Sequence, residues 1–147
     1  MEQHFEGSDT GALFSLFENR APVSSRTPIH VHANDDETFY MLEGEMTAIV
    51  DGDKVVLRSG ESILLRRNIP HQLLNESTAT ARYLLLCTPS GFEGFLAEGG
   101  VLLQPGSLPR PTSSEDIERM RNAAPQFGIT LLRDWPAKQS TSPSDLE

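Results

Sequence analysis

The chain has 147 residues, and its 12 Lys and Arg against 21 Asp and Glu give a formal net charge of 12 − 21 = −9. This acidic balance argues against a nucleic-acid binder and against electrostatic docking on an anionic membrane, since both need a basic face. The single cysteine, Cys87, excludes an intrachain disulfide and any multi-cysteine metal site. No apolar run approaches the roughly 20 residues that span a bilayer, and residues 1–11 are too polar and acidic for a signal peptide. We therefore expect a cytoplasmic protein with neither nucleic-acid nor membrane partners.

Short apolar segments separated by turn residues fill the first two thirds of the chain. Asp51-Gly52 between two alternating segments is a strong hairpin signal. Closely spaced short strands of this kind are typical of an all-β sandwich or barrel. The pattern predicts eight strands, at residues 12–18, 29–32, 37–42, 45–50, 54–57, 62–65, 72–75 and 81–87.

The chain changes character after Pro89. Ser90 with Glu93, and Thr112 with Glu115, match the capping-box spacing that begins a helix, and Pro125 should end the second helix. We therefore predict one domain over residues 1–138, with a barrel at about 12–90 and short helices at about 90–135. Residues 139–147 are polar and have almost nothing to bury, so we expect a disordered tail.

Three histidines and a glutamate lie in a suggestive arrangement. His30 and His32 are two residues apart on one predicted strand, so their side chains leave the same face. Glu37 opens the next strand, and His71 follows a tight turn. Imidazole nitrogens and one carboxylate form a ligand set for a divalent transition metal. By contrast, Asp35 and Asp36 are read as solvated turn residues, and Cys87 as a small core residue.

The segment from Thr27 to Gly44 resembles the first motif of the cupin superfamily, with two histidines flanking one residue, then a glutamate and a glycine. The segment from Gly60 to Asn75 resembles the second motif, with its single histidine. Three positions depart from the family pattern. Ser24 replaces a glycine, and Arg66 and Asn68 replace the proline and glycine of the turn before the histidine. Asn tolerates the left-handed backbone region better than other non-glycine residues.

The resemblance implies a double-stranded β-helix, or jelly-roll barrel, that binds one divalent ion through His30, His32, Glu37 and His71. Iron, manganese, nickel, cobalt, copper and zinc all remain open. Strand parity places further side chains on the metal side of the barrel, and the following helix adds two aromatic residues. The predicted substrate pocket is lined by Phe39, Met41, Met46, Leu73, Phe92 and Phe95. The alternative, in which such inward-facing side chains simply fill the barrel, stays open.

The small cupins that this chain resembles are often labelled quercetin-dioxygenase-like, which implies a dioxygenase-type oxidoreductase acting on a small aromatic or enolisable molecule. Glu37 is then the candidate catalytic residue, because a carboxylate there can take a proton from the substrate. Two alternatives stay open: a cyclase, isomerase or lyase that uses the metal as a Lewis acid, and a non-catalytic binding module. The resemblance also implies a homodimer, and the apolar strand at Tyr83–Cys87 supports it, since both of its faces need burial.

Overall fold

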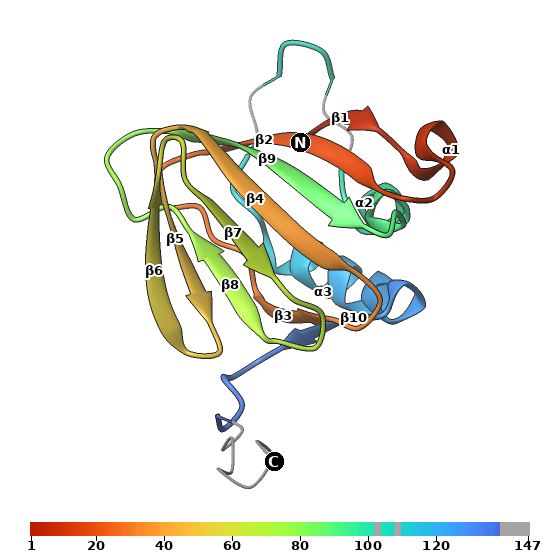
Figure 1. The fold of residues 1–147 in the computed structure, drawn as a ribbon. Coiled ribbons are helices and arrows are strands. Elements are labelled where there is room, and N and C mark those ends of the chain that lie inside the picture. Colours follow the sequence, from red (N-terminus) through yellow and green to blue (C-terminus); the bar gives the residue numbers. More distant parts are fainter. Residues whose placement is uncertain (102–103, 108–109, 139–147) are drawn as a thin grey trace, which may run out of the picture.

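The computed structural model describes residues 1–101, 104–107 and 110–138. Two antiparallel sheets of five strands face each other and close into a jelly-roll barrel (Figure 1). The first sheet has the order β1-β2-β9-β4-β7, and the second has the order β10-β3-β8-β5-β6. The strands are β1 (Glu2–Phe5), β2 (Ser15–Ala21), β3 (Ile29–His32), β4 (Asp36–Glu43), β5 (Glu45–Val50), β6 (Asp53–Arg58), β7 (Ser62–Leu65), β8 (His71–Leu74), β9 (Ala81–Thr88) and β10 (Ile129–Leu132). The predicted all-β barrel is thus confirmed.

Alternating apolar residues build the core between the two sheets. Along β9, Ala81, Tyr83, Leu85 and Cys87 are buried, while the residues between them are partly exposed. Phe17, Phe39 and Met41 meet them from the same sheet, and Met46, Ala48 and Leu73 from the other. Burial raises the pKa of the Cys87 thiol far above its usual value, so this residue is the predicted core residue and not a nucleophile.

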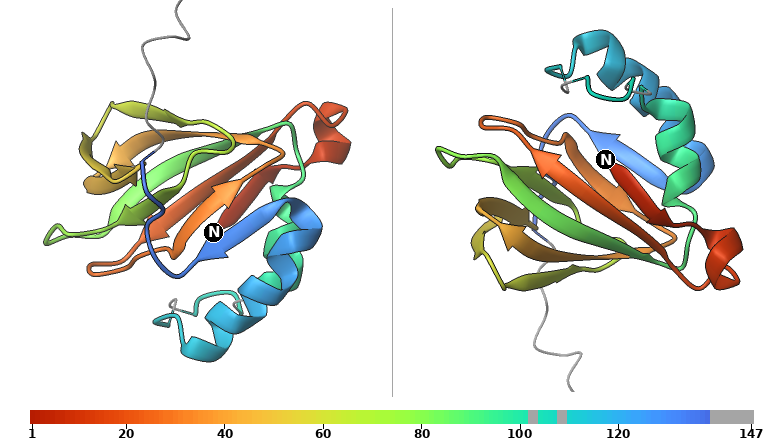
Figure 2. Two further views of the ribbon diagram at one scale, coloured as in Figure 1. Left: turned by 90° about the horizontal axis from the view of Figure 1, so that it is seen from below. Right: turned by 90° about the horizontal axis from the view of Figure 1, so that it is seen from above.

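Two helices and a short 3-10 helix follow the barrel: α2 (Phe92–Gly99), α3 (Ser114–Ala123) and η1 (Ala124–Phe127). Figure 2 shows α2 and α3 packed side by side against one side of the barrel, opposite the β5–β6 hairpin. They share a small second core, which contains Phe95, Ala123, Ala124 and Ile129. None of the helices among the described residues is long and apolar enough to cross a membrane.

Both predicted capping boxes need correction. Helix α2 begins after Gly91 rather than Ser90, and glycine has no side chain to cap it. The Glu93 carboxylate accepts hydrogen bonds from the backbone N–H groups of Gly7 and Gly91. The second box lies one residue later than predicted, between Ser113 and Asp116. Arg110 and Arg119 also donate hydrogen bonds to Asp116, which explains why Asp116 rather than Glu115 completes the capping box. As predicted, α3 ends just before Pro125.

Three elements were not predicted: β1, the one-turn helix α1 (Gly7–Thr10) and β10. Strand β1 pairs with β2, and β10 pairs with β3 through Ile129–His32 and Leu131–His30. Strand β10 therefore lies beside β3 in the same sheet, and β3 carries two of the predicted metal ligands, His30 and His32. The tail predicted at residues 139–147 lies outside the described residues.

The turn residues that replace family glycines adopt the left-handed backbone that glycine would favour. Ser24 and Asn68 both have φ 66°. Such a conformation costs little for Asn and more for Ser. The Asn68 backbone N–H donates to the His32 carbonyl at 2.6 Å. This contact connects the turn before His71 to the end of β3.

The homodimer stays a prediction, and the outer face of the first sheet is where we expect its contact. Tyr40 and Leu64 are 46% and 47% exposed there. Tyr40 is the register partner of Leu84 on β9, and Leu64 is the register partner of Thr38, which lies between it and Leu86. Because Leu64→Glu places a charge on this face without touching the core, it should convert the dimer to a monomer in light scattering. Val56→Glu, on the second sheet and 40% exposed, is the control and should leave the mass unchanged. A monomeric parent protein at micromolar concentration would contradict the prediction.

Candidate metal centre

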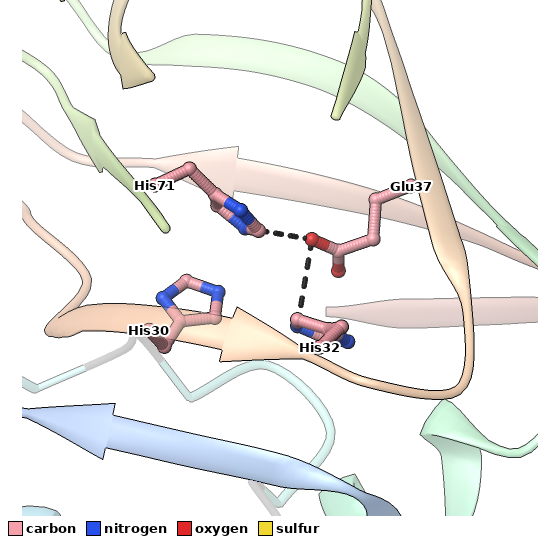
Figure 3. Close-up of side chains that lie close together, drawn as sticks. All are labelled: His30, His32, Glu37 and His71. Carbon is pink, nitrogen blue, oxygen red and sulfur yellow. Dashed lines mark ion pairs between the residues drawn. The ribbon is translucent and has the colours of Figure 1, made fainter. Parts of the chain in front are cut away.

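The four predicted ligands converge between the two sheets. Strand β3 supplies His30 and His32, strand β8 supplies His71, and strand β4 of the opposite sheet supplies Glu37. His30 is the register partner of His71 across the β3–β8 pair, with ring centroids 4.2 Å apart. One potential ligand atom from each residue lies within 4.8 Å of those of the other three. Figure 3 shows the histidine rings arranged around the Glu37 carboxylate.

Each histidine is oriented by a bond from its Nδ1 atom. Nδ1 of His32 lies 3.0 Å from Asp35 Oδ1, Nδ1 of His30 lies 2.8 Å from the Pro28 carbonyl, and Nδ1 of His71 lies 3.3 Å from the Ile69 carbonyl. All three partners are acceptors, so Nδ1–H must donate in each case. The neutral rings then direct their Nε2 lone pairs toward the centre.

The centre consists of acceptors without donors. Glu37 Oε2 lies 2.9 Å from His71 Nε2 and 3.5 Å from His32 Nε2. These three atoms are fully buried and have no hydrogen-bond partner of proper geometry among the described residues. Buried acceptors that face one another are unfavourable unless a proton or a cation lies between them. A divalent ion bound to the Nε2 atoms and the carboxylate would satisfy them together, so the residues fit the metal that the sequence predicts.

Opposing effects set the charges of the metal-free site. Burial alone would raise the pKa of Glu37, but a hydrogen bond from His71 and the positive charge of the surrounding histidines, when these rings are protonated, lower it to about 2. Burial and the neighbouring His71 lower the pKa of His30 to about 3. Burial also disfavours protonation of His32, yet Asp35 and Glu37 outweigh it and raise the pKa of that ring. The carboxylate is therefore ionised and His30 is neutral across the physiological range, as metal ligands must be.

Asp35 is the functional residue that sequence reasoning missed. It was predicted to be a solvated turn residue, but it is 6% exposed and hydrogen-bonds to His32. A carboxylate that holds the Nδ1–H of a ligating histidine fixes the tautomer and the direction of the ring. Its spacing, three residues after His32 and two before Glu37, is the signal that could have identified it. Asp36, by contrast, points outward and pairs with Arg67 at 3.2 Å.

The predicted pocket residues separate into three groups. Phe39 and Met41 are buried in the barrel core, and Phe95 is buried in the helical core. Phe92 packs on both cores, with its ring 5.7 Å from that of His32. Only Met46 and Leu73 line a cavity of about 510 Å³ at one end of the barrel. Strand parity correctly predicted that the side chains on the strands face inward. Facing inward does not by itself place a side chain in a pocket, because Phe39 and Met41 pack in the core of the barrel.

The raised pKa of His32 predicts how metal binding depends on pH. A proton on His32 competes with the ion once the pH falls to the pKa of this ring, whereas His30 competes only near pH 3. Because the pKa of His32 lies above the usual 6.5, the apparent metal affinity should fall about tenfold per pH unit as the pH drops from about 6.5 towards 5, and it should recover as the pH rises. Zinc titration at several pH values measures this slope. An affinity that is flat over this range would show that histidines are not the ligands.

Comparison with known proteins places the four residues inside a known domain. Residues 17–87 match the family model described as a cupin domain. The chain is 30% identical over 79 residues to an uncharacterized protein of Methanocaldococcus jannaschii, covering 54% of this chain and 63% of that one. It is 32% identical over 87 residues to quercetin 2,3-dioxygenase of Bacillus subtilis, covering 59% of this chain and 26% of the dioxygenase. The chain thus spans less than two thirds of either curated relative.

Among solved structures, the polyketide cyclase RemF from Streptomyces resistomycificus superposes with a TM-score of 0.53 at 26% identity. The match covers 60% of this chain and 63% of the cyclase. The two named enzymes carry out different reactions, so the comparisons identify the domain and leave the reaction open.

Proposed function

This chain belongs to the cupin superfamily, and we propose that its four-residue centre is the active site of a metal-dependent, dioxygenase-type oxidoreductase. The substrate would be a small aromatic or enolisable molecule. The observation that carries the proposal is the set of buried, unpartnered acceptors on His32, His71 and Glu37, which need a cation. The similarity to quercetin 2,3-dioxygenase supports an oxygenase. Because the match covers only 26% of that enzyme, it does not identify the substrate of this chain.

A divalent ion bound here would supply Lewis-acid polarisation of a substrate oxygen and, if redox-capable, a site for oxygen chemistry. The residues of this chain perform the remaining tasks. The three histidines hold the ion, Asp35 holds the His32 ring, and Glu37 takes a proton from the substrate. A carboxylate that lies beside a divalent ion is a weak base, so Glu37 can accept this proton only when polarisation has acidified the substrate.

A second candidate function is a cyclase, isomerase or lyase that uses the ion only as a Lewis acid. The superposition on a polyketide cyclase over 60% of the chain favours it. This reaction needs the same ligands and the same proton acceptor but no oxygen. The nature of the metal and the uptake of oxygen therefore separate the two candidates.

The test begins with the metal content of the purified protein. We expect one divalent ion per chain by elemental analysis, and His71→Ala should lose most of it, because the change removes an imidazole ligand and puts no donor atom in its place. His4→Ala is the matched control, since His4 lies on β1, outside the cluster, and should bind metal normally. A protein that neither contains nor takes up metal would overturn both enzymatic proposals.

Turnover then distinguishes the candidates. The protein is loaded separately with iron, manganese, nickel, cobalt, copper or zinc and mixed with quercetin and with other enolisable aromatics. Oxygen uptake with a redox-capable ion, and none with zinc, supports the dioxygenase. Product formed with zinc and without oxygen uptake supports the Lewis-acid enzyme. Full metal occupancy without turnover of any substrate would favour the third hypothesis, a non-catalytic binding module.

A further inference from the structure

The cavity at one end of the barrel has a composition that differs from that of the chain as a whole. It is formed by the end of β2, the loop that follows it and residues 110–112. Figure 2 shows the segment before α3 on the same side of the barrel as this loop. Among the described residues, the lining contains Arg20, Arg26 and Arg110 and neither Asp nor Glu, although acidic residues outnumber basic ones in the sequence. A volume of about 510 Å³ lies within the range of small-molecule pockets.

Arg26 is the cation best placed to meet a ligand. Arg110 is already held by Asp116, with Nη2 donating at 2.9 Å, and Arg20 lies 3.8 Å from Glu18. Within residues 1–101, 104–107 and 110–138, no carboxylate lies within 4.0 Å of Arg26. Arg26 attracts the Glu76 carboxylate only weakly, whereas Lys54 Nζ lies 3.0 Å from Glu76 Oε2 and forms the ion pair with it. The guanidinium of Arg26 is therefore available to bind an anion.

The inner wall of the cavity is apolar and leads toward the metal centre. Met46, Leu73 and Tyr83 face it from the barrel core. Leu73 lies two residues after His71 on β8, which corresponds to roughly 7 Å along a strand. The Tyr83 oxygen accepts a hydrogen bond from Asn19 at 2.6 Å, so its own proton remains for another acceptor. One polar donor thus sits among apolar groups, as in sites that orient a small molecule.

We propose that this cavity binds a small organic anion, with its carboxylate or phosphate at Arg26 and its apolar end between Met46 and Leu73. The proposal deepens the proposed function and rests on it, because the bound molecule would be the substrate presented to the centre at His71. The arginines favour a ligand with a negative charge, and the apolar inner wall favours a ligand with an apolar body. Binding itself needs no metal, so it can be measured independently of turnover.

Matched pairs of probes test the proposal on the chain of residues 1–147, stripped of metal with a chelator. We compare 2-naphthoate with 2-naphthamide, and 2-naphthyl phosphate with 2-naphthol, by isothermal titration. Each pair differs in charge at one end and shares the naphthalene body. At least one anion should bind with one molecule per chain and about tenfold more tightly than its neutral partner. Arg26→Gln should abolish that preference without weakening the neutral probe.

Arg58→Gln is the control, because Arg58 is an exposed arginine on β6 that does not line the cavity. This variant should keep the full preference for the anion. The proposal is overturned if neither anion binds better than its neutral partner, or if Arg58→Gln weakens binding as much as Arg26→Gln. Anion binding by a protein that takes up no metal would support the anion-binding cavity and overturn the proposed metal-dependent enzyme. Metal binding without a preference for the anion would overturn the anion-binding cavity and leave the proposed enzyme standing.

Discussion

Glu37→Gln should lower turnover by about 10²- to 10⁴-fold while the protein keeps most of its metal. Glutamine preserves the size and one oxygen donor but removes the charge and the ability to accept a proton. Three histidines are sufficient to hold a transition metal such as zinc, so His30, His32 and His71 should retain the ion. A general base contributes typically about 10²–10⁴ to a rate, and this sets the size of the expected loss.

The measurement is the turnover number per bound metal ion, with occupancy determined on the same sample. Glu43→Gln is a suitable control, because Glu43 ends the same strand, is exposed and pairs only with Arg82 among the described residues. It should match the parent in both metal content and rate. If activity of Glu37→Gln follows its metal content one for one, Glu37 is a ligand and nothing more. A fully loaded variant as active as the parent would disprove the assigned role.

Asp35→Asn should weaken metal binding by about 10- to 100-fold, the range typical of residues that hold a ligating histidine. The amide can still accept the Nδ1–H bond of His32, but it no longer provides the negative charge that makes the ring a stronger donor. Removing that charge should also lower the pKa of His32 in the metal-free protein, because Asp35 contributes most to raising it. Competitive zinc titration measures the affinity, and NMR titration of the His32 ring measures the pKa.

Asp36→Asn is the matched control for this prediction. Asp36 is the next residue in the chain, but its carboxylate pairs with Arg67 and with the Arg67 backbone N–H rather than with a histidine. This variant should leave both the affinity and the pKa of His32 unchanged. Equal losses in the two variants would point to a general disturbance of the turn. An unchanged affinity in Asp35→Asn would show that Asp35 does not support the metal centre.

Most of the barrel follows from short-range patterns. Strand β9 could be predicted because its apolar run and its length appear directly in the sequence, although its alternating burial appears only in the fold. The hairpin at Asp51-Gly52 was predictable for a similar reason, since both residues adopt the positive φ that such a turn requires. Strand β10 was not predictable, because only the distant β3 gives it a hydrogen-bonding partner. The hydrogen bond that the Glu93 carboxylate accepts at the start of α2 likewise depends on Gly7, which lies far away in sequence.

The sequence by itself determined the four candidate ligands, because the side-chain chemistry of His30, His32, Glu37 and His71 and the two-residue period of a strand are local properties. Only the tertiary structure decided how the ligands are held and what surrounds them. Burial of Asp35 against His32 depends on the path of a turn, and the turn residues alone favoured solvation. The cavity at Arg26 forms where a loop after β2 meets a segment some 85 residues later, because long-range packing brings the two together.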